Sequence, residues 1–361
     1  MHGYREPRLM EAALDASRWT GAIGTAKEAT APCTLTRVTN TDVGEQAASL
    51  RRWDQIYEQL TPGPFLGTLH EVCFGGVQLF RETTSQSVHE AGGAWAGSRS
   101  LGVPLAMSGA ALFRGQPVRL GAVMALSGSD DLEFYAPRGF DLLGVSVDEH
   151  ALREHARRVE DRDIDRLFGG RAVLVPDAAR LDDFRRTLLS MLNSLDANPT
   201  ALRFEPAQRL LEETVLGAIV ALADGNDAAP ASAPATGRQH VVERARAYMD
   251  AHIDEPMTIA GVCVALGVSR RTLQYSFHEV LGINPVRFLR ALRLNGVRRD
   301  LKCAPAGATV QDTAARWGFW HLGHFVTDYK HMFGELPSAT LHERSAGARR
   351  RFGAGRAPRR E

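Results

Sequence analysis

Short runs in which apolar and polar residues alternate occupy the first half of the chain, between residues 32 and 147. Glycine, proline and serine separate these runs, and alternation is the pattern of strands that have one face in a core. The spacing favours an antiparallel barrel or sandwich. The predicted strands are residues 34–38, 65–70, 77–82, 101–107, 118–124, 132–135 and 142–147.

Apolar residues recur every three or four positions after residue 147, which predicts helices. Three such stretches are residues 148–159, 177–195 and 205–224. An apolar stripe of this kind indicates either a helix packed on the strands or a surface that pairs with a second copy of the chain. For residues 205–224 both interpretations stay open.

One pattern is written twice between residues 257 and 338. Each copy predicts a helix, a tight glycine turn, a second helix, a glycine stop and a proline. The first copy consists of Thr258, Gly267, Leu273, Phe277, Gly282 and Pro285, and the second of Thr309, Gly318, Phe325, Tyr329, Gly334 and Pro337. This order is the layout of a helix-turn-helix, whose second helix enters the major groove of DNA.

The second helix of the first copy, residues 269–280, has one face suited to reading bases. Leu273 and Phe277 recur on its inward side, which leaves polar side chains on the other. Arginine can fork onto guanine and glutamine can pair with adenine. The alternative is a set of ordinary solvated residues, and the duplication favours base reading. The candidate residues are Arg270, Arg271, Gln274 and Tyr275.

The second copy predicts a reading helix over residues 321–333. Leu322 and Thr327 lie at outward positions, and Leu322 suits contact with a thymine methyl group. Arg316, His324 and Lys330 suit phosphate, and phosphate contacts set position rather than sequence.

The repeated motifs resemble the DNA-binding domain of AraC/XylS-type transcription regulators. The matching positions include Leu266 to Leu273, Leu281 to Pro285, Trp317 to Phe319, and Phe333-Gly334 with Pro337. The resemblance implies that a helix over residues 285–301 holds both motifs on one DNA face, in successive major grooves about 34 Å apart. It also implies an N-terminal cupin-like barrel that holds a small effector. Residues 287–299 are weakly similar to regulators of amine and ethanolamine use.

The near-neutral net charge of +1 conceals an asymmetry between the two halves. From Arg238 onward the chain has 20 Lys and Arg against 11 Asp and Glu, so the preceding part is acidic. A basic C-terminal part on an acidic N-terminal part is expected of a DNA reader attached to a regulatory domain. Arginine-rich residues 345–361 predict a disordered basic tail.

The rest of the sequence shows no pattern that predicts an enzyme. No His-x-His pair occurs, and His89-Glu90 lacks the second histidine of a zinc-protease helix. Nucleophile-elbow and phosphate-loop motifs are absent, so no catalytic residue, metal or cofactor is predicted. Aromatic side chains are available to line a small-molecule pocket or to fill a core, with Arg81 or Arg114 to meet an anion. They are Phe74, Phe80, Trp95, Phe113, Phe134, Tyr135 and Phe140.

These patterns predict an α+β chain in several parts. Residues 1–31 form an N-terminal segment that is possibly disordered. Residues 32–224 form an effector-binding and dimerisation domain, with a cupin-like barrel over 32–147 and packed helices over 148–224. A linker follows at 225–237, then an all-α DNA-binding domain of two helix-turn-helix motifs joined by a helix at 238–344.

The expected function is a sequence-specific transcription regulator, an activator that binds DNA as a homodimer, responds to a small-molecule effector and contacts RNA polymerase. We expect a cytoplasmic location. The four cysteines are scattered, no apolar leader is apparent, and no apolar run is long enough to span a membrane. The alternatives are a barrel enzyme and a DNA-binding protein without effector control.

Overall fold

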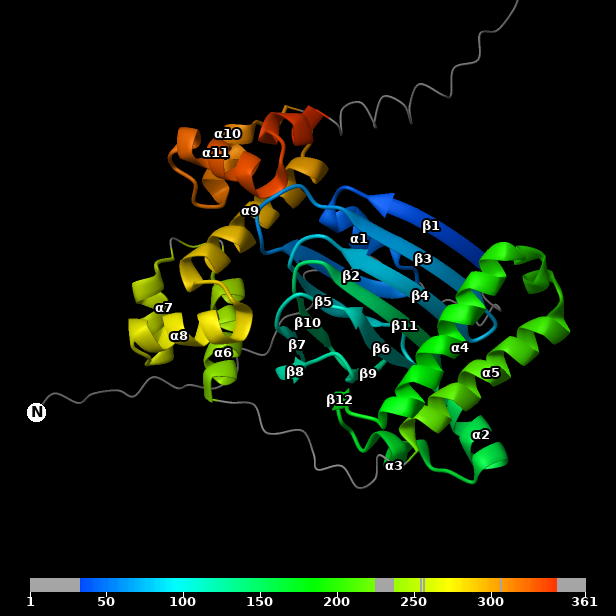
Figure 1. The fold of residues 1–361 in the computed structure, drawn as a ribbon. Coiled ribbons are helices and arrows are strands. Elements are labelled where there is room, and N and C mark those ends of the chain that lie inside the picture. Colours follow the sequence, from blue (N-terminus) through cyan, green and yellow to red (C-terminus); the bar gives the residue numbers. More distant parts are fainter. Residues whose placement is uncertain (1–32, 225–236, 254, 256, 306, 343–361) are drawn as a thin grey trace, which may run out of the picture.

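The structure, a computed structural model, describes residues 33–224, 237–253, 255, 257–305 and 307–342. Two β-sheets occupy the middle of the molecule, with helices α2 to α5 on one side and helices α6 to α11 on the other (Figure 1). The predictions for residues 1–31, most of the 225–237 linker and the 345–361 tail fall outside the described residues.

The N-terminal part consists of two antiparallel sheets. The larger sheet has the strand order β1-β3-β4-β11-β6-β9-β12 and the smaller β2-β5-β10-β7-β8. The larger sheet contains β1 (Thr34–Asn40), β3 (Gly67–Phe74), β4 (Val77–Thr84), β6 (Ser98–Ala106), β9 (Val123–Ser127), β11 (Phe140–Asp148) and β12 (Val173–Leu174). The smaller contains β2 (Trp53–Gln59), β5 (Val88–Ala94), β7 (Ala111–Phe113), β8 (Gln116–Val118) and β10 (Leu132–Ala136).

This arrangement confirms the α+β class and corrects two details. The sheets face each other without closing into a barrel. The run at 118–124, expected as one strand, is divided between β8 and β9, which belong to different sheets. Gly121 lies between them with a φ of +95°, a left-handed conformation that favours glycine and turns the chain.

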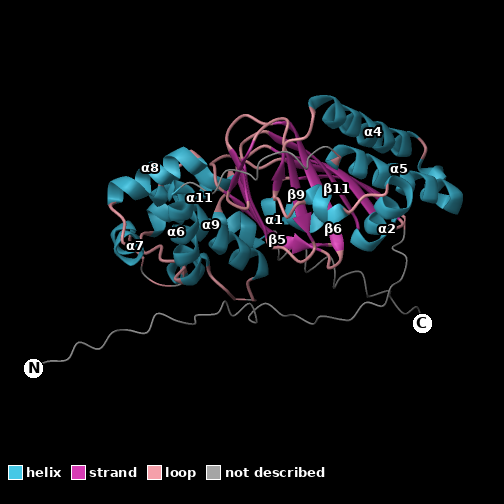
Figure 2. Ribbon diagram, turned by 90° about the horizontal axis from the view of Figure 1, so that it is seen from below, coloured by secondary structure: helices cyan, strands magenta, loops and turns pink. Residues whose placement is uncertain are grey.

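Two apolar cores lie on the two faces of the larger sheet. One face packs against α2 (Glu149–Glu160), α3 (Ile164–Phe168), α4 (Ala178–Ala197) and α5 (Glu205–Ala223), as Figure 2 also shows for α2, α4 and α5. The other face packs against the smaller sheet. The stripe predicted at 205–224 belongs mainly to the first core, because Val215, Leu216, Ile219 and Val220 are buried there. A short 3-10 helix, Pro199–Arg203, joins α4 to α5.

The C-terminal part is all helical, as predicted. It contains α6 (Gly237–Ala251), α7 (Ile259–Leu266), α8 (Arg270–Leu281), α9 (Pro285–Cys303), α10 (Val310–Arg316) and α11 (Leu322–Phe333). Helices α6 to α8 gather at one end of α9, and α10 and α11 gather at the other (Figure 1).

Polar contacts join the C-terminal helices to the sheets. Asn295 of α9 exchanges two hydrogen bonds with the backbone of Gln59 in β2, at 2.8 and 3.0 Å. The Gln59 amide also donates to the Met332 carbonyl of α11 at 2.8 Å. The end of β2 is thereby joined to both the connecting helix and the second motif.

Charged pairs extend this contact to α1 (Val43–Ser49). Asp42, the residue that caps α1, accepts from Arg298 at 2.6 Å and pairs with Lys302 at 2.8 Å. Arg299 pairs with Glu58 of β2 at 3.0 Å. On the same face of the smaller sheet as Glu58, Arg246 of α6 donates to the Tyr135 hydroxyl at 3.0 Å. The acidic sheet domain and the basic helices therefore meet through complementary charges.

Candidate nucleic-acid interface

Capping residues determine where the two helices of the first helix-turn-helix begin and end. Thr258 accepts a hydrogen bond from the Gly261 backbone at 3.1 Å and begins α7. Gly267 ends α7 with a φ of +68°, and Ser269 begins α8 by accepting from the Thr272 backbone at 3.0 Å. These contacts satisfy backbone groups that a helix end leaves unpaired. The turn between α7 and α8 is therefore fixed by local interactions.

The second motif repeats this design with one difference. Thr309 caps α10 by accepting from the Asp312 backbone at 3.0 Å, and Gly318 takes the left-handed turn conformation at a φ of +78°. His321 stands where Ser269 stands in the first copy, but its side chain makes no cap hydrogen bond. The N-terminal backbone groups of α11 consequently have no protein side chain as a cap.

Helix α9 carries both motifs, as the resemblance implied. Asn284 caps it and Pro285 occupies its first turn, while eleven of its residues are buried. Phe288 of α9 packs on Phe277 of α8 with ring centroids 5.3 Å apart. At the other end, Trp317 lies on Gly296, and its Nε1 donates to Asp300 at 2.9 Å. Both motifs are thus packed on one rigid element.

Helix α8 presents the predicted base-reading side chains to solvent. Arg270, Arg271, Gln274 and Tyr275 are all exposed, whereas Leu273 and Phe277 are fully buried. Arg271 lies over the Tyr275 ring at 5.3 Å from its centroid. Residues 271, 274 and 275 are neighbours on a helix surface, so they form one face. The structure brings this predicted set together.

Helix α11 presents a less polar face. Leu322, His324, Thr327 and Lys330 are exposed. The Thr327 hydroxyl donates to the Gly323 carbonyl at 3.0 Å within its own helix. Residues 324, 327 and 330 are spaced three apart and form a row on the helix surface. This row suits contact with the phosphate backbone of DNA.

One exposed residue of this region was absent from the predicted set. Trp320, in the turn before α11, is 73 % exposed. Its signal in the sequence is an aromatic residue between a glycine turn and a helix start. Arg316, which belongs to the predicted set, lies at the end of α10 and pairs with Asp300 at 3.3 Å. Its charge is therefore partly compensated within the protein.

The predicted pocket aromatics fall in different places. Phe80, Phe113 and Phe134 line a cavity between the two sheets. Phe140 packs on Phe134 at 5.2 Å between ring centroids. Phe74 belongs to the core under α4 and α5, and Tyr135 packs toward the C-terminal helices.

Three other candidates serve structural contacts. Arg81 is bound by Asp141 and Arg114 by Asp130, both within 2.9 Å. The Trp95 ring is covered by Arg52 at 3.8 Å from its centroid. The anion contacts considered for Arg81 and Arg114 are thus already made by carboxylates of the protein.

Comparison with known proteins identifies the helical part. A family model described as a helix-turn-helix domain matches residues 262–343. This match covers α8 to α11 and most of α7, together with the motif residues shared with AraC/XylS regulators. The domain is of the AraC/XylS type.

The AraC/XylS-type domain also has relatives among characterised proteins. The chain is 30 % identical over 212 residues to a probable thc operon regulatory protein of Rhodococcus erythropolis, which covers 57 % of this chain and 62 % of that protein. It is 28 % identical over 102 residues to a XylDLEGF operon transcriptional activator of Pseudomonas putida, covering 28 % of this chain and 32 % of the activator. The chain therefore spans less than two thirds of the length of these relatives.

A solved structure is also similar to part of the chain. It is a probable AraC family transcriptional regulator from Rhodopseudomonas palustris, 33 % identical, with a TM-score of 0.28 over 29 % of this chain and 97 % of that one. The Rhodococcus match is longer than the whole stretch after Arg238. It therefore includes residues that precede the AraC/XylS-type domain.

Across the ranges that the structure describes, no three His, Cys, Asp or Glu side chains are grouped to hold a metal ion. Within those same ranges, no helix combines the length and apolar character required for a membrane span.

Proposed function

We propose that the protein is a sequence-specific DNA-binding transcription regulator. The observation that carries the proposal is the exposed row Arg271, Gln274 and Tyr275 on α8, next to a second motif held by the same helix α9. The named relatives are operon regulators, and none of the motifs expected of a catalytic site occurs in the sequence. A non-enzymatic role in the cytoplasm follows from this proposal.

We propose separate roles for the two parts of the chain. Residues 238–344 would bind DNA, and residues 32–224 would bind a small effector and pair with a second copy. Phe204 and Leu210 support a pairing surface on or beside α5, because both remain more than 60 % exposed there. Contact with RNA polymerase belongs to the same proposal, as activation of transcription requires it.

Arg271 and Gln274 are expected to read bases. Replacing either by alanine should weaken binding of the full chain to its preferred site by about 1–3 kcal/mol and relax specificity at one or two base pairs. The measurement is selection from a random DNA pool, followed by titration of the best site. Arg186→Ala is the control, since this exposed arginine of α4 lies away from the DNA-binding helices and bonds to Asp183 of its own helix.

The same titration tests the wider proposal. A wild-type chain that selects no sequence would contradict it, and one chain per site at saturation would contradict the dimer. Equal weakening of all DNA sequences by Arg271→Ala would assign that side chain to the backbone instead.

Lys330 is expected to bind phosphate. Its replacement by alanine should weaken binding to all sequences alike and reduce the slope of log affinity against log salt by about 1, because one fewer counterion is released. Titrations between 50 and 200 mM salt measure this slope, again with Arg186→Ala as the charge-matched control. An unchanged slope would place Lys330 away from DNA.

A further inference from the structure

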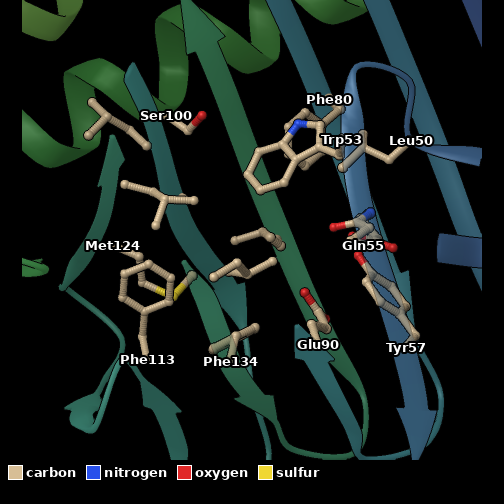
Figure 3. Close-up of a pocket in the computed structure, with 16 residues that line it drawn as sticks. Leu50, Trp53, Gln55, Tyr57, Phe80, Glu90, Ser100, Phe113, Met124 and Phe134 are labelled. Carbon is tan, nitrogen blue, oxygen red and sulfur yellow. Dashed lines mark hydrogen bonds between the residues drawn. The ribbon is translucent and has the colours of Figure 1, made fainter. Parts of the chain in front are cut away.

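A cavity of about 50 Å³ lies between the two sheets (Figure 3). Most of its wall is apolar and includes Phe80, Met124 and Phe134. Two carboxyl groups also line it, Glu82 from β4 and Glu90 from β5, together with the Tyr57 hydroxyl from β2. Glu82 is 3 % and Glu90 6 % exposed. Two acids in an apolar cavity require a physical explanation, because buried charges are costly unless they are paired.

Glu82 has its partners within the protein. One oxygen accepts from the Gln46 amide at 2.8 Å, and the other accepts from the Tyr57 hydroxyl at 3.1 Å. Glu90 also lies within hydrogen-bonding reach of Tyr57. A phenol has a single proton to donate, so Tyr57 cannot serve both acids at once. Among the described contacts, Glu90 therefore lacks a hydrogen-bond donor of its own.

No positive charge compensates the two acids. Tyr57, Glu82 and Glu90 are the only titratable side chains that line the cavity among the described residues, and no Lys, Arg or His does. Burial raises the pKa of Glu82 to about 7, although its bonds with Gln46 and Tyr57 oppose this. Burial, and then repulsion from Glu82, raise the pKa of Glu90 well above its usual range. Near pH 7 Glu82 is therefore about half ionised while Glu90 is protonated, so the pair carries at most one negative charge.

We propose that this cavity binds a small organic cation, an alkylamine with one protonated nitrogen, between Glu82 and Glu90. An ammonium group has three N–H donors and one charge, which suits one carboxylate and a second acceptor. The aliphatic part would contact the apolar wall. The volume favours a ligand of few non-hydrogen atoms, since about 150 Å³ is needed for benzene. The assignment names the effector class of the proposed regulator, and so rests on that function.

The surroundings of the acids connect the cavity to the DNA-binding helices. Tyr57 is followed in β2 by Glu58 and Gln59, which bind Arg299 and Asn295 of α9. Gln46, the partner of Glu82, lies in α1, whose cap Asp42 binds Arg298.

An ammonium group bound to Glu82 would compete with Tyr57 and Gln46 for hydrogen bonds to the Glu82 carboxylate. Occupancy would therefore act on β2 and α1, the two elements that hold α9. It can change DNA binding only if the ligand prefers one arrangement of these elements over another.

Isothermal titration of the full chain with ethylamine, propylamine and butylamine tests the proposal, with the matching alcohols as uncharged controls. The amines should bind at least about tenfold more tightly than the alcohols, as expected for hydrogen bonds to a charged group. Their affinity should rise about tenfold from pH 6 to pH 8, because protons compete for a carboxyl group with a pKa of about 7. Buffers of different ionisation enthalpy would report the released proton at pH 6.

Substitutions provide the second arm. Glu82→Gln and Glu90→Gln should each weaken amine binding at least about tenfold, and the pH dependence should disappear in the double variant. Glu71→Gln is the matched control, because Glu71 is fully buried, lies outside the cavity and bonds to Gln78 at 2.6 Å. Thermal unfolding checks that each variant is folded.

The outcomes separate the two proposals. Alcohols that bind as well as amines, amines that give no heat, or folded glutamine variants with unchanged affinity would each overturn the cation site. If wild-type protein still selects a DNA site in those cases, the regulatory function stands alone. Amine binding by a chain that selects no DNA would overturn the regulatory function and leave the cation site in place.

Discussion

Replacing Arg298 by methionine is expected to lower the free energy of unfolding by about 3–5 kcal/mol, the usual cost of removing one partner from a buried ion pair. Arg298 donates to Asp42 and Glu335, each at 2.6 Å, and covers the Phe333 ring at 4.7 Å. Its side chain is only 10 % exposed. Methionine keeps the apolar contact with Phe333 and removes the charge that both carboxylates share.

Chemical denaturation of the full chain measures this loss. Arg287→Met is the control on the same helix, since Arg287 is exposed, and it should change stability by less than about 0.5 kcal/mol. Equal stability of Arg298→Met and wild type would show that Lys302 alone compensates Asp42.

The contribution of Asp42 to the free energy of unfolding should depend on pH in a definite direction. Burial acts to raise the pKa of Asp42, but Arg298 and Lys302 outweigh it and lower that pKa below its ordinary value. Asp42 therefore contributes its stability above about pH 4, the unfolded pKa, and loses it as pH falls through the lower folded value. Because the charge of Arg298 is the largest single contribution that lowers this pKa, the acid-side loss should be smaller in Arg298→Met.

The second large effect is expected at Gly296. An alanine Cβ at this position would lie 2.2–2.4 Å from ring atoms of Trp317, closer than any real contact. Alanine normally favours a helix interior by about 1 kcal/mol over glycine. Here displacement of Trp317 would also break its bond to Asp300, so we expect a net loss of about 2 kcal/mol. DNA affinity should fall as well, because Trp317 positions α10 and α11 on α9.

Gly261→Ala is the control for this substitution. Its Cβ would meet only the Thr258 hydroxyl, at 3.5 Å, so stability should be unchanged or slightly raised. Thermal unfolding and titration with the selected DNA measure both effects. A Gly296→Ala protein that retains wild-type stability and affinity would show that α10 and α11 do not depend on this packing.

Local signals explain why the helical part was predictable. Helices α7 and α8 each begin at a side-chain cap, and α7, α8 and α11 each end at a glycine in the left-handed region, so these signals and the apolar spacing set their boundaries within a few positions. Predicted and observed helices accordingly differ by one or two residues at most boundaries. The outward positions of α8 followed from the same periodicity, because Leu273 and Phe277 fixed which face is buried.

Two of the strands that the sequence did not predict, β2 and β5, were missed for the same reason. β2 and β5 bury polar side chains, Glu58 and Gln59 in the first and His89 and Glu90 in the second. These residues disrupt the alternation that marks a strand. Their burial is possible only because distant segments supply partners, as Arg299 does for Glu58, or because a cavity receives the side chain. Departures of this kind from the usual sequence pattern of a strand are typical of functional sites.

The sequence by itself determined the two helix-turn-helix units and the residues that their second helices expose, because caps, turns and periodicity act between near neighbours. Only the tertiary structure decided that β2 joins the cavity to α9, and that Glu82 and Glu90 line one cavity from two different sheets. Those relations depend on which segments meet in space, and partners such as Gln59 and Asn295 are separated by more than two hundred residues.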